Sequence, residues 1–419
     1  MDCTKNLILL TASFPFGRQE TFLENEIPIL AEEFDKITIL HSNKDDIKRS
    51  VPTNVDCIHT PLDLNKKETL KSYFHLFKIL VWKEILRMLF IYKQMPSIGF
   101  FKTLFIAISK GKKMQEAIEK HFSSTELKSS ILYSYWCDDH AIGLAFLNKK
   151  YNNKLKTISR AHGWDVYFEV SLFNYLPLRS FIHKHLTQLF PISYKGKSYM
   201  EQRWKIKDKI TVSRLGTSPP PLEGDQGGEH SLKLKNKNDI FTIVTCSNLI
   251  PLKRINLIID ALSLIKEIPI HWVHFGDGPE QEKLQQQANE FLSSNIQVEW
   301  KGRVTNQTVL EFYKKVKPHL FINVSSSEGI PVSIMEAMSY GIPCIVTNVG
   351  GNSEIVDNKN GKLMSSNPTN EELKEIIEYF LNLNETNYSN YQDSAFNTWK
   401  KYFNANINYL TFSETLKKI

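Results

Sequence analysis

Residues 325–338 read Ser325-Ser326-Ser327-Glu328-Gly329-Ile330-Pro331-Val332-Ser333-Ile334-Met335-Glu336-Ala337-Met338. They follow the apolar run 319–324, which is typical of a buried strand. The pattern predicts a strand, a short polar loop with one acid, and a helix carrying a second acid. A helix start offers free N–H groups and a positive dipole end to phosphate, and carboxylates accept hydrogen bonds from hydroxyls. The stretch therefore predicts a site for a phosphorylated, hydroxyl-rich ligand.

The same order of strand, loop and helix recurs on both sides of a break at 217–228, where three prolines and three glycines favour an exposed linker. The predicted strands before the break are 7–10, 37–40, 131–135, 157–159 and 188–192. Those after it are 241–245, 270–275, 298–300, 320–324 and 344–347. Strands alternating with helices indicate parallel sheets covered on both faces. We predict an α/β protein of two doubly wound, Rossmann-like domains facing across a cleft, with ligands at the carboxyl ends of the strands.

The predicted domains are an N-terminal domain at 1–216, a linker at 217–239 and a C-terminal domain at 240–392. The tail, 393–419, has a helical pattern with aromatic anchors, and two placements for it are open. In the first placement the tail crosses back and packs against the N-terminal domain. In the second it is a simple terminal helix of the C-terminal domain.

The composition of the 419 residues, 42% apolar and 23% charged, is that of an ordinary globular protein. The five cysteines form no CxxC pair, which favours a reducing compartment. The N-terminus lacks the pattern of a secretory signal, and no run reaches the roughly 18 apolar residues of a spanning helix. We expect a cytoplasmic protein that is not integral to a membrane.

The net charge of +7 is concentrated in residues 71–113, which hold nine Lys or Arg and a single acid, Glu84. This segment contributes 9 − 1 = +8, so the remainder sums to 7 − 8 = −1. Many aromatic residues accompany the basic ones, a combination that suits an anionic membrane surface. The alternative is a set of ordinary helices with aromatic residues in the core. Nucleic acid is the weaker option because no recognised binding module accompanies the patch.

The motifs of the second half resemble a known family. Glu328 and Glu336, followed by Gly341-Ile342-Pro343 and by Gly350-Gly351-Asn352-Ser353-Glu354, are similar to the glutamate–seven residues–glutamate signature of the family-four retaining glycosyltransferases of the GT-B fold. The resemblance implies that Glu336 binds the nucleotide ribose and that Glu328 contacts hydroxyls of the donor sugar. It also implies that the N-terminal domain binds the acceptor and the C-terminal domain the nucleotide sugar. The loop and helix start between the glutamates would complete the donor site with Gly329, Ile330, Pro331 and Val332.

In this family a lysine that matches Lys253 grips the donor diphosphate, and a fixed cation there stabilises the charge of the leaving group. The family's usual arginine, five residues earlier, is replaced by Asn248, and Arg254 is a candidate substitute. Asp277 and Gly278 lie in a turn that the family places near the donor. Arg303 and Val304 match the segment whose backbone pairs with the base. An ordinary strand-to-loop turn is the alternative for both segments.

In the first half, Arg160-Ala161-His162-Gly163-Trp164-Asp165 resembles the family's histidine loop facing the donor sugar. Asp165 would orient His162 or bind the acceptor. Gly17 would let the backbone approach the diphosphate, and Arg18 or Glu20 would meet the acceptor. The expected catalytic residues are His162, Lys253 and Glu328.

Asp138-Asp139-His140 is similar to an acidic metal-binding motif of another glycosyltransferase fold, but helix capping explains the aspartates better. We expect neither a metal nor a cofactor.

The sequence thus predicts a retaining hexosyltransferase that moves a sugar from a nucleoside-diphosphate sugar, with UDP favoured over GDP, to a hydroxyl of a lipid-linked glycan. Its expected setting is the inner face of the plasma membrane of a bacterium, in the synthesis of capsule, exopolysaccharide or lipopolysaccharide. The alternatives are a non-catalytic nucleotide-sugar-binding relative, which the Asn248 departure favours, and a GT-B sugar-nucleotide epimerase.

Overall fold

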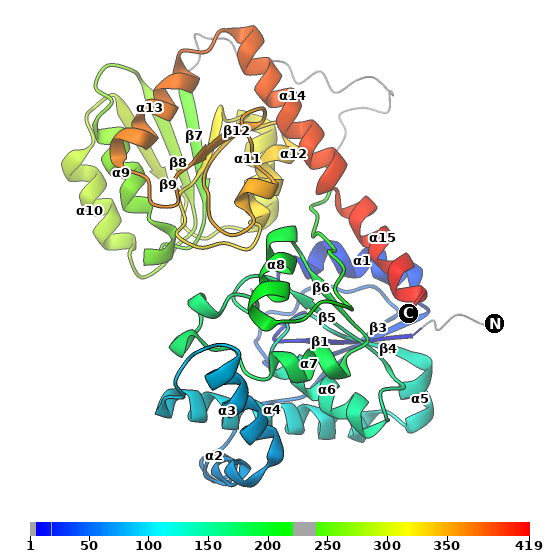
Figure 1. Cartoon of the computed structure of the whole chain (residues 1–419). Helices are drawn as coiled ribbons and strands as arrows, with labels where there is room; N and C mark the ends of the chain where they lie inside the picture. Colours follow the sequence, from blue (N-terminus) through cyan, green and yellow to red (C-terminus); the bar gives the residue numbers. More distant parts are fainter. Residues whose placement is uncertain (1–5, 18, 221–239) are drawn as a thin grey trace. The chain divides into compact units, whose positions relative to one another are not determined.

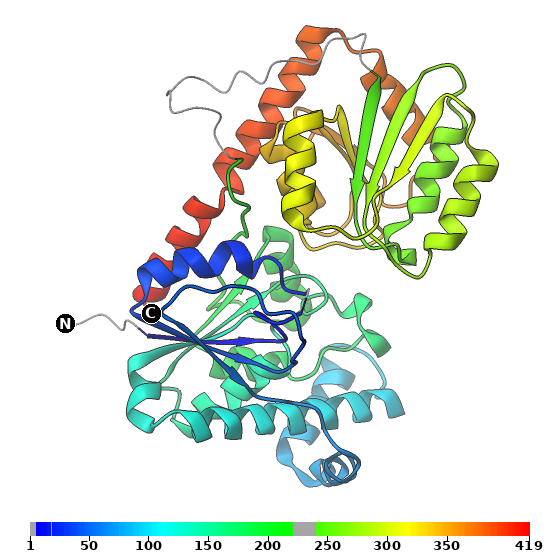
Figure 2. The ribbon, with the colours of Figure 1, turned by 180° about the vertical axis from the view of Figure 1, so that it is seen from behind.

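The computed structural model describes residues 6–17, 19–220 and 240–419, so Arg18 and most of the predicted linker lie outside the described residues. The chain forms two compact units. The first comprises 1–215 and 406–419, and the second comprises 216–405. Each unit contains one six-stranded sheet with helices on both faces (Figures 1 and 2).

The sheet of the first unit has the strand order β3-β2-β1-β4-β5-β6, and all its pairs are parallel. Its strands are β1 (Asn6–Thr11), β2 (Lys36–His41), β3 (Val55–His59), β4 (Ser130–Ser134), β5 (Lys156–Ala161) and β6 (Gln188–Pro191). Its helices are α1 (Leu23–Glu33), α2 (Lys66–Ser72), α3 (Ile79–Phe90), α4 (Ile98–His121), α5 (Ser124–Ser129), α6 (Asp139–Lys150), α7 (Arg179–His185) and α8 (Tyr194–Tyr199). The order reverses between β1 and β4, where doubly wound sheets bind ligands.

The second unit repeats this topology with the order β12-β11-β10-β7-β8-β9. Its strands are β7 (Phe241–Cys246), β8 (Ile270–Phe275), β9 (Ile296–Trp300), β10 (Leu320–Asn323), β11 (Cys344–Thr347) and β12 (Gly361–Met364). Its helices are α9 (Ile255–Ser263), α10 (Gln281–Phe291), α11 (Asn306–Val316), α12 (Val332–Ser339), α13 (Asn370–Leu381) and α14 (Glu385–Tyr402). Here the order reverses between β7 and β10.

Burial on both faces explains why the central strands are continuous apolar runs. Ile8 and Leu10 of β1 pack into one core, and Leu7 and Leu9 pack into the core on the opposite face. All ten strands predicted from the sequence are present. The two that the sequence did not predict, β3 and β12, each lie at one end of their sheet, and their middle residues are partly exposed. Neither has the unbroken apolar run of a buried strand, so the hydrophobic signal of both is weak.

The tail consists of two helices. The predicted boundary at 393 falls inside α14, which belongs to the second unit, whereas α15 (Ala405–Lys417) lies almost entirely in the first. Phe412 of α15 packs 4.0 Å from the guanidinium of Arg160, which is fully buried and ion-paired with Glu26. Lys417 also pairs with Glu33 of α1. These contacts make α15 part of the first unit's core.

The basic segment, 71–113, covers the last two residues of α2, the 3₁₀ turn Tyr73–Phe77, all of α3 and much of α4 (Figure 1). Its only acid, Glu84, is buried and accepts hydrogen bonds from the Tyr175 hydroxyl and the Leu178 amide. Burial raises the pKa of the Glu84 carboxyl. No helix of the described residues is long and apolar enough to cross a membrane.

Candidate active site

The predicted donor residues of the second unit lie in the segments that follow its strands, and Lys253 and Glu328 follow β7 and β10, between which the strand order reverses. The loop after β7 leads to Lys253, and the loop after β10 leads to Glu328. The two loops are joined because the Ser326 amide donates a hydrogen bond to the Leu252 carbonyl at 2.9 Å. Parallel strand order thus brings together residues 75 positions apart.

Lys253 and Glu328 form an ion pair at this edge. The Lys253 Nζ donates to Glu328 Oε1 at 2.6 Å, and Asn323 Nδ2 donates to the same oxygen at 3.3 Å. The two charged side chains are only 20% and 11% exposed. Partial burial reduces screening by water, so this cation is well placed to act on an incoming anion.

Glu336 lies on α12, one turn beyond the helix start, and is 7% exposed. Its Oε1 accepts a hydrogen bond from Asn306 Nδ2 at 2.6 Å. Asn306 is the first residue of α11 and was not predicted as a site residue. The one feature of the sequence that could have pointed to Asn306 is its position two residues after Val304, which was already predicted to bind the donor.

Arg254 is hydrogen-bonded to other parts of the second unit. Its guanidinium donates to the carbonyls of Val324, Ser325 and Ser366 and to Asn367 Oδ1. These bonds fasten the end of β10 to the loop after β12. These contacts give the Arg254 guanidinium a structural role, and its substitution for the arginine that the family has in place of Asn248 stays a prediction. Asn248 itself is exposed.

Two glycine turns let neighbouring loops meet at this edge. Gly350 has φ +49°, and a Cβ there would lie 1.7 Å from the Glu328 carbonyl oxygen. A Cβ on Gly278 would lie 2.4 Å from the Leu249 carbonyl oxygen. The turn at Gly350 thus packs against the loop that carries Glu328, and the predicted donor turn at Gly278 packs against the loop that leads to Lys253. After Gly351 the chain forms a single 3₁₀ turn, Asn352–Glu354.

Arg303 and Asp277 lie close together on the loops after β9 and β8, with 3.9 Å between Nη1 and Oδ1. Both side chains are more than two-fifths exposed. The Gly276 amide donates to the Gly302 carbonyl at 2.9 Å, which joins these loops. Val304, next to Arg303, is partly buried. The segment is accessible, and its predicted contact with the base stays a prediction.

In the first unit, Glu20 has a different role from the predicted one. Its two oxygens accept hydrogen bonds from the amides of Ala12, Ser13 and Phe14, from the Ser13 hydroxyl and from Trp136 Nε1. It is 5% exposed and has φ +55°. This carboxylate holds the loop after β1 against the loop after β4, so it is not a free acceptor contact.

Gly17 lies in the same loop, is buried and has φ +68°, a conformation suited to glycine. Its amide donates to the Ile47 carbonyl at 2.8 Å. This hydrogen bond gives Gly17 a structural role, and its approach to a diphosphate stays a prediction.

His162 follows β5 and is 6% exposed. Its ring packs against Tyr135 and Trp136, with centroids 4.7 and 4.4 Å away. Among the described residues neither ring nitrogen has a hydrogen-bond partner, and Nδ1 lies 3.6 Å from Asp165 Oδ2. A buried polar atom without a partner is unusual, which suggests that a ligand completes this position.

Asp165 is fully buried and accepts hydrogen bonds from the amides of Cys137 and His162 at 2.9 and 2.7 Å. Burial alone raises its pKa, but the His162 side chain and the two amides lower it below the ordinary value. The geometry supports the orienting role predicted for Asp165. With no exposed surface, it cannot contact an acceptor directly.

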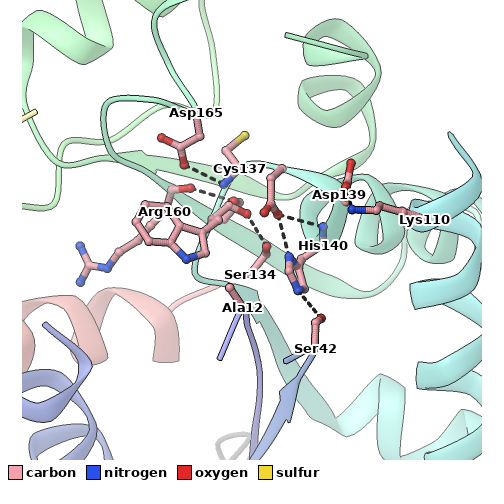
Figure 3. Close-up of polar contacts among 12 residues, drawn as sticks. Ala12, Ser42, Lys110, Ser134, Cys137, Asp139, His140, Arg160 and Asp165 are labelled. Atoms are coloured by element: carbon pink, nitrogen blue, oxygen red, sulfur yellow. Dashed lines mark hydrogen bonds and ion pairs between the residues drawn. The ribbon is translucent and has the colours of Figure 1, made fainter. Parts of the chain in front are cut away.

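The Asp138–His140 motif is a helix cap, as the sequence indicated. Asp138 precedes α6 and accepts from both the amide and Nδ1 of His140, and His140 Nε2 lies 2.8 Å from the Ser42 hydroxyl (Figure 3). Asp138 raises the pKa of His140, although burial opposes it. Burial and Asp138 raise the pKa of Asp139, which lies 3.6 Å from Lys110, to about 6. In the described part of the chain, no group of three or more His, Cys, Asp or Glu could hold a metal ion.

The two sheets and their strand orders define the GT-B fold. Over 99% of this chain and 100% of the other, the structure is similar to that of Alr3699/HepE from Anabaena, solved with UDP and glucose, with a TM-score of 0.66 and 15% identity. Residues 229–395 match the family "Glycosyl transferases group 1". The resemblance read from the sequence is therefore confirmed, and its signature motifs lie within the matched residues.

Two curated relatives come from Escherichia coli. The O-antigen biosynthesis glycosyltransferase WbnH is 26% identical over 244 residues, covering 57% of this chain and 63% of the relative. The putative colanic acid biosynthesis glycosyltransferase WcaL of strain K12 is 26% identical over 218 residues, covering 49% and 50%. The chain spans about half to two thirds of the length of these two relatives.

Proposed function

We propose that this protein is a retaining glycosyltransferase of bacterial surface-polysaccharide synthesis that takes its sugar from a nucleoside diphosphate, preferably UDP. The observation that carries the proposal is the pairing of Lys253 with Glu328 at the strand reversal of the second unit, together with the buried Glu336 on α12. O-antigen and colanic acid synthesis, printed in the names of relatives, supply the biological setting.

In this proposal Lys253, Glu328 and Glu336 each bind a different part of the donor. Lys253 exchanges its bond to Glu328 for the diphosphate, together with the free amides at the start of α12. Glu328 is then released to accept hydrogen bonds from sugar hydroxyls, and Glu336, steadied by Asn306, accepts from the ribose. Lys253 stabilises the charge that gathers on the leaving diphosphate, whose oxygen takes the proton of the attacking acceptor hydroxyl. No metal or cofactor takes part.

We further propose that α2, α3 and the start of α4 dock on an anionic membrane, which brings the enzyme to a lipid-linked acceptor. Of the 24 exposed large hydrophobic residues in the described part of the chain, eleven lie between 70 and 98. They are Leu70, Tyr73, Phe74, Leu76, Ile79, Trp82, Leu86, Phe90, Ile91, Met95 and Ile98. Exposed lysines at 71, 78, 83, 93 and 102 accompany them. Apolar residues beside basic ones match a layer of anionic headgroups over acyl chains.

The docking proposal is tested by sedimentation with vesicles of phosphatidylglycerol or phosphatidylcholine. Each lysine near an anionic surface contributes about 1 kcal/mol, so Lys83→Gln with Lys93→Gln weakens binding to phosphatidylglycerol by about 30-fold. The matched control is Lys400→Gln with Lys401→Gln on α14, which leaves binding unchanged. Equal binding of all three proteins, or no preference for phosphatidylglycerol, contradicts the proposal.

The transfer reaction is tested with UDP-sugars and polyprenyl-diphosphate-linked mono- and disaccharides. A transferase releases UDP at an appreciable rate only when the correct acceptor is present. A non-catalytic relative binds UDP without releasing it from any sugar, and an epimerase converts the donor without an acceptor. The exposed Asn248 and the occupied Arg254 favour the non-catalytic relative as the second candidate, because the grip on the diphosphate lacks its usual arginine.

A further inference from the structure

Trp164 is an exposed aromatic side chain at the carboxyl edge of the first unit. It lies in the loop after β5, between His162 and Asp165, and is 50% exposed. Its ring packs on Trp136, with 5.2 Å between centroids, and Trp136 packs in turn on His162 at 4.4 Å. Trp164 therefore faces solvent, with the half-buried Trp136 and the buried His162 behind it.

The stack is rigid because each ring behind Trp164 is fixed. Trp136 Nε1 donates to Glu20 Oε1 at 2.6 Å, and that carboxylate is held by the loop after β1. The backbone of His162 is fixed by Asp165, which also ties it to the loop after β4. A rigid aromatic surface loses little conformational entropy when a ligand binds.

His162 supplies a second, independent sign of a ligand. Its ring is more than nine-tenths buried, and both nitrogens lack hydrogen-bond partners among the described residues. A ligand that binds here must offer a hydrogen-bond donor or acceptor to the His162 ring nitrogens and must also pack on an aromatic surface. A sugar ring does both, since one face carries C–H groups that pack on the negative face of an aromatic ring, while its hydroxyls donate and accept hydrogen bonds.

We propose that Trp164, backed by Trp136, is a platform on which a sugar ring of the acceptor stacks. This proposal rests on the function proposed above and assigns to Trp164 the acceptor contact that buried Asp165 and Glu20 cannot make. The ring could also be that of the donor, so the experiment has an arm for each source.

The experiment uses the full-length protein and saturation-transfer NMR with methyl glycosides of glucose, galactose and N-acetylglucosamine as probes. Saturation is expected to be strongest on the C–H protons of one ring face for at least one glycoside. Trp164→Ala weakens its binding about 3- to 10-fold, whereas Trp164→Phe retains most of it. Tyr194→Ala, which removes another exposed aromatic ring of the first unit, leaves it unchanged.

UDP binding is measured on the same proteins by calorimetry. Three results together support the acceptor platform. Trp164→Ala binds UDP as tightly as the natural protein, it binds the glycoside more weakly, and a UDP-sugar does not displace the glycoside from the natural protein. Displacement of the glycoside by the UDP-sugar assigns the ring to the donor and overturns the proposal. Glycoside binding that is absent in the natural protein, or equal in Trp164→Ala, also overturns it. Wild-type protein that binds the glycoside but not UDP refutes the proposed function and leaves the platform standing.

Discussion

Replacing Lys253 by methionine tests the donor site most directly. The change keeps most of the side-chain volume and removes the cation from its bond to Glu328. A hydrogen bond to a charged group contributes about 1.5–3 kcal/mol, and each 1.4 kcal/mol is tenfold in affinity. We therefore expect UDP to bind about 10- to 150-fold more weakly, as measured by calorimetry.

The same substitution also lowers stability by an amount that the structure bounds. Removing one partner of a fully buried ion pair costs about 3–5 kcal/mol, whereas exposed pairs are worth about 0–1 kcal/mol. With the two side chains 20% and 11% exposed, about 2 kcal/mol is expected. In a unit of this size the Tm falls by about 2–4 °C for each kcal/mol, so its transition moves down by about 4–8 °C.

A double variant separates the two effects. Lys253→Met with Glu328→Gln leaves no unpaired charge, so it recovers most of the lost Tm but none of the lost UDP affinity. The matched control is Lys374→Met, which breaks a helix-surface pair with Glu378 and changes neither quantity appreciably. If Lys253→Met binds UDP and melts like the natural protein, the assignment of this edge as the donor site is wrong.

Three further substitutions probe the second unit. Asn306→Leu removes the donor to Glu336 and weakens UDP binding several-fold by calorimetry, but leaves 2′,3′-dideoxy-UDP unaffected, and equal losses for both nucleotides would contradict the ribose contact. Gly350→Ala forces a Cβ against the Glu328 carbonyl and lowers the unit's melting temperature, whereas an unchanged Tm would mean that this loop yields freely. Burial lowers the pKa of His274 from 6.5 to about 4. The folded state therefore binds its proton less tightly than the unfolded state, and stability is lost as pH falls through this window, by about 3 kcal/mol at pH 4. In urea unfolding, the free energy of unfolding of His274→Asn should fall less between pH 7 and pH 4 than that of the natural protein. An equal fall in both proteins would show that His274 is not responsible.

The central strands and the signature motifs could be predicted because their signals are local in the sequence. Buried parallel strands such as β1 and β7 require unbroken apolar runs, and these are legible in a single sequence. Glu328, Glu336 and Lys253 stand directly after such strands or in the following helix, so their place at the carboxyl edge follows from the pattern. The edge strands β3 and β12 carry no such run.

The partners of the site residues could not be predicted in the same way. A guanidinium close to Lys253 in the sequence suggested a second cation, but Arg254 donates its hydrogen bonds to carbonyls at the ends of β10 and β12. Glu20 looked available for an acceptor until the fold placed three amides and Trp136 around it. Which groups surround a charge depends on chain crossings far apart in the sequence.

The doubly wound units and the donor motif can be read from periodicity and spacing along the chain. Which polar residues remain available to a ligand becomes visible only in the folded protein. In the folded protein Glu20 and Arg254 bind other parts of the chain, and Asp165 is completely buried. Among the described residues neither ring nitrogen of His162 has a hydrogen-bond partner, and Trp164 is exposed beside Trp136. The physical reason is that hydrogen-bond satisfaction and burial are properties of the folded surroundings, whereas residue type alone fixes only what a side chain is able to do.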